Sequence, residues 1–168
     1  MRKNLTARLV SVLAVIAVAV AAAGGGPAAR ASQAGTRAVK LFFILDEGNG
    51  QMGRRVGCGD SVVPVVVKVA PTASPLKAAL TELLAAKGEF YCETGLRNSL
   101  SQSSLTVEAA SVSKGTATIR LTGEYKDGGH CDTPRAQAQL VETARQFAAV
   151  RRVRILVNGA EMKFNPND

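Results

Sequence analysis

The sequence contains no tryptophan, and aromatic residues make up only 4% of its 168 positions. Proteins that bind single-stranded nucleic acid without sequence preference use several aromatic rings as stacking platforms, so this scarcity argues against a nucleic-acid partner. It also means that a hydrophobic core must be built mainly from valine, leucine, isoleucine and alanine.

The chain has one histidine, His130, and three cysteines, Cys58, Cys92 and Cys131, with no C-x-x-C pair. Structural zinc sites use about four clustered cysteine or histidine ligands, so no metal site is expected. A thiol hydrolase using Cys131 and His130 is an alternative, but neighbours in sequence rarely have the geometry that a nucleophile and its base require. The acidic residues form no obvious general acid/base pair, so we expect no enzyme and no cofactor.

One glycine-rich stretch matches a cofactor motif by letter only. Residues 48–53 read G-N-G-Q-M-G, which fits G-x-G-x-x-G after a predicted strand. That motif needs a helix N-terminus directly afterwards to hold a pyrophosphate. Residues 54–59 continue the loop instead, so we interpret the glycines as turn residues.

Long hydrophobic runs are confined to the N-terminus. A basic segment at residues 2–8 precedes an apolar run from Val10 to Ala23, and Ala29-Arg30-Ala31 offers small residues to a signal peptidase. This arrangement is typical of a secretory signal peptide over residues 1–31, cleaved before Ser32. The apolar run has about 14 residues, whereas a membrane-spanning helix needs roughly 20. An uncleaved anchor is the alternative, and it is the only way in which we expect the chain to contact a membrane.

An exported chain meets an oxidising environment, so one disulfide and one spare cysteine are expected. The formal net charge of +8 includes four basic residues of the signal segment, which leaves a modestly basic exported part. Such an excess favours contact with anionic wall polymers or lipid headgroups, but most proteins with a similar excess have no such partner. The candidate surface for a ligand or partner consists of Arg54 and Arg55 in the glycine-rich loop and Arg152 and Arg154 on a strand.

Hydrophobic periodicity predicts a single small α+β domain with the order β-β-α-β-β-α-β, a mixed sheet and both helices on one face. The domain covers residues 39–168 and follows a flexible lead-in at residues 32–38. Strands are expected at 39–45, 62–69, 105–109, 117–121 and 153–157, and helices begin at Pro75 and Pro134 after the caps Ser74 and Thr133.

The same periodicity predicts which side chains form the core. In the second strand, Pro64 removes a backbone donor and therefore predicts an edge position, a strand start or a bulge. In the second helix, Leu140, Ala144, Phe147 and Ala148 form the expected buried face. Seven residues from strands and helices are expected to be mostly buried: Leu80, Leu83, Ile119, Leu140, Phe147, Val153 and Ile155.

Seven segments carry motifs whose order and spacing are informative together: Leu41–Asp46, Val63–Val69, Pro75–Leu84, Gly95-Leu96, Gly115–Leu121, Ala136–Thr143 and Val153–Gly159. Over residues 39–159 they resemble the sporulation and spore germination (GerMN) domain. The resemblance implies a small α+β domain outside the cytoplasmic membrane, with no catalytic residues. The chain departs from the lipoprotein members of that family because no cysteine precedes Cys58.

The resemblance also implies a disulfide. Residues 57–60 and 129–135 look like two loops of a cysteine-bearing branch of the family, in which the loops are joined. This implies a Cys58–Cys131 bridge with Cys92 unpaired. A Cys92–Cys131 bridge is the rival, because loop-closure energies separate the two pairings by only a few tenths of a kcal/mol.

These observations predict an extracytoplasmic, non-enzymatic interaction or scaffold module of the bacterial cell envelope. Its partner would be an envelope protein or a cell-wall component, and the sequence leaves the oligomeric state open. The alternative is a secreted binding module for a cell-wall polymer or a small anionic ligand.

Overall fold

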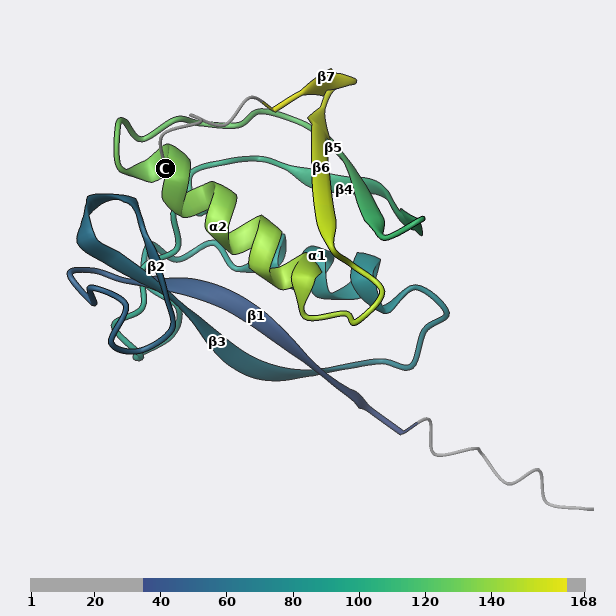
Figure 1. The fold of residues 1–168 in the computed structure, drawn as a ribbon, viewed down its shortest axis with the longest axis horizontal. Coiled ribbons are helices and arrows are strands. Elements are labelled where there is room, and N and C mark those ends of the chain that lie inside the picture. The colour runs from purple at the N-terminus through teal and green to yellow at the C-terminus, as the bar shows by residue number, and fades with distance from the viewer. Residues whose placement is uncertain (1–34, 163–168) are drawn as a thin grey trace, which may run out of the picture. The chain divides into compact units, whose positions relative to one another are not determined.

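The computed structural model describes residues 35–162, so the predicted signal segment and cleavage site lie outside the described residues. These described residues belong to one compact unit. Its elements, in chain order, are β1 (Arg37–Leu45), β2 (Arg54–Val56), the short 3₁₀ helix η1 (Gly57–Gly59), β3 (Asp60–Val69), α1 (Pro75–Ala85), β4 (Thr106–Ser113), β5 (Thr116–Thr122), α2 (Asp132–Arg145), β6 (Arg152–Val157) and β7 (Ala160–Glu161) (Figure 1).

The strands form two sheets. One is antiparallel with the order β1-β3-β2, and the other is mixed with the order β4-β5-β6-β7, in which β5 and β6 run parallel. Helix α1 contacts β1 and β4, and α2 contacts β1 and β6, so each helix touches both sheets (Figure 1). The α+β class, the small single domain and the approximate element order are therefore confirmed.

The expectation of one sheet covered on one face is corrected. Helix α2 buries apolar side chains over a wide arc, including Ala136, Ala138, Leu140 and Val141. A helix with apolar surface on more than one side needs more than one packing partner, and the two sheets supply them.

The sequence did not predict β2, which pairs its three residues with Asp60–Val62 of β3. Gly53 precedes β2 with φ of +116°, and a side chain there would collide with the carbonyl oxygen of Val62. Glycine is therefore needed for β2 to close on β3. Because β2 begins at Arg54, opposite Val62, it does not reach Pro64. Pro64 therefore lies on a stretch of β3 that needs no ladder donor on that side.

Strand β4 contains a bulge that reverses one sequence expectation. Its register against β5 shifts between Val107 and Ala109, which leaves Glu108 as the additional residue. A bulge moves the following side chains to the opposite face of the sheet. Ala110 therefore packs against the core with Val107, whereas strict alternation from Leu105 predicted Ala109.

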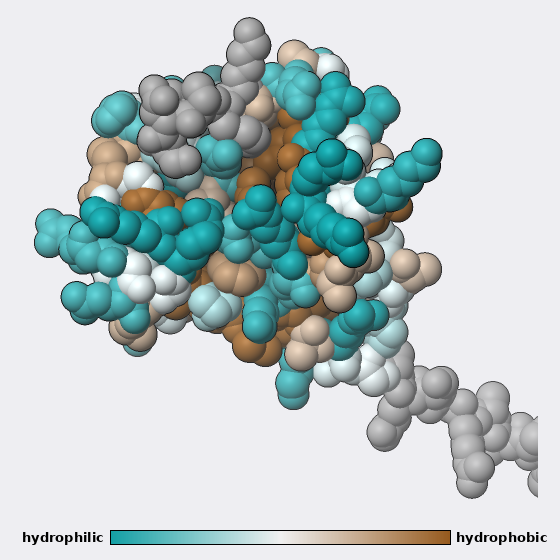
Figure 2. Space-filling model, in the orientation of Figure 1, coloured by the Kyte–Doolittle hydropathy of each residue, from teal (hydrophilic) through white to brown (hydrophobic). Residues whose placement is uncertain are grey.

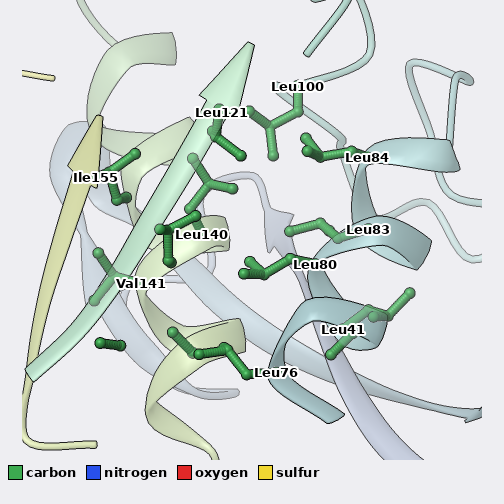
Figure 3. Close-up of a cluster of buried hydrophobic side chains, with 14 of the residues drawn as sticks. Leu41, Leu76, Leu80, Leu83, Leu84, Leu100, Leu121, Leu140, Val141 and Ile155 are labelled. Carbon is green, nitrogen blue, oxygen red and sulfur yellow. The ribbon is translucent and has the colours of Figure 1, made fainter. Parts of the chain in front are cut away.

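One hydrophobic core joins both helices to both sheets (Figure 3). Leu80, Leu83, Ile119, Leu140 and Ile155 are fully buried, as predicted. Phe147 and Val153 are only partly buried, although both pack against this core. Ala148 is exposed because α2 ends at Arg145, so the helical face predicted for residues 147 and 148 does not continue that far.

Truncation of a central core residue gives a direct test of this packing. We expect Leu80→Ala to lower the free energy of unfolding by roughly 2–5 kcal/mol, because Leu80 is fully buried on α1 and the cavity cannot fully collapse. Glu82→Ala on the exposed side of the same helix is the matched control and should change it by about 0.5 kcal/mol or less. Urea denaturation measures both, and a loss below about 0.5 kcal/mol for Leu80→Ala would mean that the helix face is wrong.

A polar stripe on α2 covers the open edge of β1. The amide of Gln146 accepts from the Lys40 backbone N–H (2.7 Å) and donates to the Lys40 carbonyl (2.6 Å). The Thr143 hydroxyl accepts from the Phe42 N–H (3.2 Å), and Gln139 donates to the Phe42 carbonyl (3.1 Å). Gln139 and Thr143 are fully buried, so these side chains satisfy backbone groups that would otherwise be buried without partners.

Candidate functional site

Cys58 and Cys131 form a disulfide with a Cα–Cα distance of 5.8 Å, and Cys92 is free and exposed. This is the pairing that the family resemblance implied. The bridge joins η1 to the residue that precedes α2. Because Cys131 is bonded to Cys58, it has no free thiol, and the thiol-hydrolase alternative loses its nucleophile.

Arg135 of α2, four residues after Cys131, forms ion pairs with three carboxylates. Its Nε lies 2.7 Å from Asp60 Oδ2, and its Nη atoms lie 3.3 Å from Asp132 and 3.6 Å from Asp46. Burial lowers the pKa of Arg135, but the Asp60 hydrogen bond and the surrounding carboxylates outweigh it, so the pKa is raised. Asp60 is almost completely buried, and Arg135 therefore neutralises a charge that water cannot reach.

Arg97 extends this network to the loop after α1. It lies 2.8 Å from Asp46 and 2.7 Å from Glu89, and its backbone pairs with that of Ile44 at the end of β1. The hydrogen bond to Asp46 raises the pKa of Arg97, with a smaller contribution from Glu89. The Arg135 and Arg97 network therefore ties β1, β3, α2 and the loop after α1 together.

The loop that enters α2 is held by Asp127. Its carboxylate accepts from the Gly129 backbone N–H (2.9 Å) and from the Thr133 hydroxyl (2.7 Å). These bonds, the backbone one first, hold the pKa of Asp127 below its usual value. A lowered pKa stabilises the loop at neutral pH, and the effect is lost as the pH falls through that pKa. The predicted cap Thr133 lies inside α2, which begins at Asp132.

A groove of about 690 Å³ lies along α2. Its lining comes from α2, from β2 and η1, and from β6, which contributes Val153. The lining residues are Arg54, Arg55, Val56, Gly57, Cys58, Pro134, Gln137, Ala138, Val141, Arg145 and Val153. We call this feature the α2 groove. Figure 2 shows hydrophilic side chains beside patches of hydrophobic surface on this face.

Three arginines line the α2 groove, of which Arg54 and Arg55 are successive residues of β2 and direct their side chains to opposite faces of that strand. Arg54 Nε and Arg145 Nη1 both bind the same oxygen of Glu142, at 3.1 Å and 3.4 Å. About half of each arginine side chain stays exposed. Arg55 forms no ion pair with any other described residue. The groove therefore carries an excess of guanidinium groups over carboxylates.

The structure brings together only two of the four arginines selected from the sequence. Arg54 and Arg55 line the α2 groove. Arg152 and Arg154 alternate with Val153 along β6, so they lie on the opposite face of the strand from this groove residue. Arg154 also pairs with Glu161 at 3.2 Å.

Sequence analysis did not select Arg145 as a groove residue. The one sequence feature that could have indicated it is its position four residues after Val141, which places both on the same face of the second helix. Within residues 35–162, no group of three or more His, Cys, Asp or Glu side chains is placed to hold a metal ion. Over that same part of the chain, no helix combines the length and the apolar character needed to cross a membrane.

Two helices packed between two small sheets define a compact α+β module with a disulfide beside a basic groove. The family model Germane, described as sporulation and spore germination, matches residues 40–163. The chain therefore belongs to the Germane family.

Among solved structures, the first GerMN domain of the sporulation protein GerM from Bacillus subtilis is 24% identical with a TM-score of 0.56, and the match covers 78% of this chain and 90% of that one. The tandem GerMN domains of the same protein match with 15% identity and a TM-score of 0.55, over 79% of this chain and 42% of that one. These similarities concern the fold. Comparison with curated protein sequences gives no significant match.

Proposed function

We propose that this protein is an exported, non-enzymatic interaction module of the bacterial cell envelope. The observation that supports binding rather than catalysis is the lining of the α2 groove. Its polar side chains are three arginines and one glutamine, and its only cysteine is in the disulfide. Hydrolysis and acyl transfer need a nucleophile or a general base, and the lining offers neither.

Export is supported by the signal sequence and by the disulfide, which persists in oxidising compartments. The expected partner is an envelope protein or a cell-wall component. The solved relative is a sporulation protein, and membership in the same family fits a function at the envelope. A second candidate, a secreted binder of a cell-wall polymer or a small anionic ligand, is supported by the unpaired Arg55.

The first measurable consequence is cleavage by a signal peptidase. We expect the exported protein to begin at Ser32, because Ala29 and Ala31 occupy the small-residue positions before the cut. Intact mass spectrometry of the protein from the envelope and culture fractions measures this. Ala31→Phe should leave the precursor uncut, whereas Ala34→Phe, beyond the site, should be processed normally. A mature chain that starts at Met1 would contradict the cleavage, and a chain found only in the cytoplasm would overturn the proposed function.

The interaction itself is tested in intact cells with a photocrosslinking residue at position 137, in the α2 groove, or at position 118 on β5. An envelope-protein adduct formed from position 137 and not from position 118 supports the interaction module. An adduct that wall hydrolases release supports the cell-wall polymer candidate. An exported chain that yields neither adduct from position 137 contradicts binding in the groove.

A further inference from the structure

We infer that the α2 groove binds an extended, carboxylate-bearing segment of a partner polypeptide, which adds as a strand to the open edge of β2. The inference rests on the proposed function and names the partner's chemistry and binding mode. Three observations support it: the edge position of β2, the excess of arginines and the apolar part of the lining.

The two outer strands of the first sheet, β1 and β2, differ in how α2 covers their edges. The edge of β1 is covered by polar side chains of α2, including Gln139 and Thr143. Strand β2 is the other edge of that sheet, pairs only with β3, and borders the α2 groove. Exposed strand edges are templates for an added strand, and peptide-binding domains use them in this way.

One backbone carbonyl of β2 accepts a hydrogen bond from a side chain and not from the backbone of another strand. Arg54 Nη1 donates to the Arg55 carbonyl oxygen at 3.2 Å. A carboxylate of an arriving segment would draw the guanidinium away, and the Arg55 carbonyl would then be available to a backbone N–H. Binding of the acid and pairing of the backbone are therefore linked at this residue.

Charge selects a carboxylate-bearing segment. Guanidinium groups bind carboxylates through two parallel hydrogen bonds, and such charge-assisted bonds are stronger than neutral ones. Arg54 and Arg145 share a single oxygen of Glu142, and Arg55 has no described carboxylate partner. Donors of all three arginines therefore remain available.

The apolar part of the lining favours a polypeptide over a phosphate-rich polymer. The α2 groove is lined by Val56, Ala138, Val141 and Val153 as well as by the arginines. Side chains of an extended strand alternate between its two sides, so a segment with alternating acidic and apolar residues can match both features. A uniformly charged polymer has no apolar groups that could pack against these valines.

A labelled peptide tests the inference with the chain from Ser32 onward, because the described residues 35–162 belong to one compact unit. The probe is a fluorescein-labelled eight-residue peptide of alternating glutamate and valine, followed by fluorescence anisotropy at low ionic strength. We expect saturable binding, and we expect Arg54→Gln with Arg55→Gln to weaken it about tenfold or more, the effect of losing two charge-assisted contacts. Arg152→Gln with Arg154→Gln removes the same charge outside the groove and should leave the affinity within about twofold.

Three further peptides and one polymer complete the design. Alternating glutamine and valine, or lysine and valine, should not bind. N-methylation of alternate backbone nitrogens in the acidic peptide should abolish binding, because the methyl groups block strand pairing. Polyphosphate of similar charge should bind only weakly, because it has neither backbone N–H groups to pair with β2 nor apolar side chains to contact the valines.

Equal weakening by both arginine pairs would reduce the interaction to general charge attraction and overturn the inference. Tight, Arg54- and Arg55-dependent binding of polyphosphate with no binding of the acidic peptide would assign the groove to an anionic polymer instead. Full binding of the N-methylated peptide would overturn the strand pairing. If the chain is exported and forms the crosslink but does not bind the acidic peptide, this inference alone is refuted. If the chain stays in the cytoplasm, the proposed function is refuted, whether or not the peptide binds.

Discussion

Replacing Arg135 with alanine is expected to lower the free energy of unfolding by about 3–5 kcal/mol, the range seen when one partner of a buried ion pair is removed. Asp60 is almost completely buried, and Arg135 provides its ion pair at 2.7 Å. Without the guanidinium, the carboxylate keeps only the Glu47 backbone N–H, at 2.9 Å, from the observed hydrogen bonds. Either the charge stays buried without compensation, or the group takes up a proton at a cost in free energy.

Guanidinium chloride would screen such a pair, so urea denaturation followed by circular dichroism is the suitable measurement. Arg120→Ala is the matched control, because Arg120 forms an exposed pair with Glu108 at 3.4 Å and such pairs contribute about 0–1 kcal/mol. Adding Asp60→Asn to Arg135→Ala should recover part of the loss, since no charge then remains buried. A loss below about 1 kcal/mol for Arg135→Ala would show that water reaches Asp60 after the truncation.

Removal of the disulfide is expected to have an effect of similar size. The bridge closes 73 residues, and the chain-entropy model gives about 4 kcal/mol for a loop of that length. Cys58→Ser with Cys131→Ser should therefore lower the unfolding free energy by roughly 2–5 kcal/mol, the usual cost in a small secreted domain. The mechanism lies mainly in the unfolded chain, which gains conformational freedom once the bridge is gone.

Cys92→Ser is the control for that experiment, because Cys92 is exposed and free, and it should leave the unfolding free energy within about 0.5 kcal/mol. Non-reducing peptide mapping should recover the peptides of Cys58 and Cys131 together. Recovery of Cys92 with Cys131 would contradict the pairing. An unchanged midpoint in the double serine variant would show that the unfolded chain is already compact around these loops.

Sequence periodicity was sufficient for the elements that bury one regular apolar face. The pattern predicts burial of Leu80 and Leu83 on α1 and of Ile119 and Ile155 on neighbouring strands, and all four side chains are fully buried. The start of α1 at Pro75 followed from the preference of proline for the first helical position. The start of α2 did not, because the helix begins at Asp132, two residues before Pro134. The pairing of Cys58 with Cys131 required the family resemblance, since loop-closure energies hardly separate the alternatives.

The parts that could not be predicted depend on contacts between distant residues. Strand β2 has three residues, two of them arginines, which is too short to show a period. Arg135 and Asp60 are 75 residues apart, and nothing local marks either as a partner of the other. The α2 groove forms where β2 and β6 both pack on one helix. The position of Arg145 in its lining therefore depends on tertiary structure alone.

The polar stripe of α2 has a consequence for the order of events during synthesis. The groups that Gln139, Thr143 and Gln146 satisfy on β1 lie 97 to 106 residues earlier in the chain. Strands β1 and β3 therefore emerge and can pair long before α2 exists, with the outer edge of β1 bare. During that interval the nascent chain exposes an unpaired strand edge, a feature that favours aggregation of incompletely folded chains.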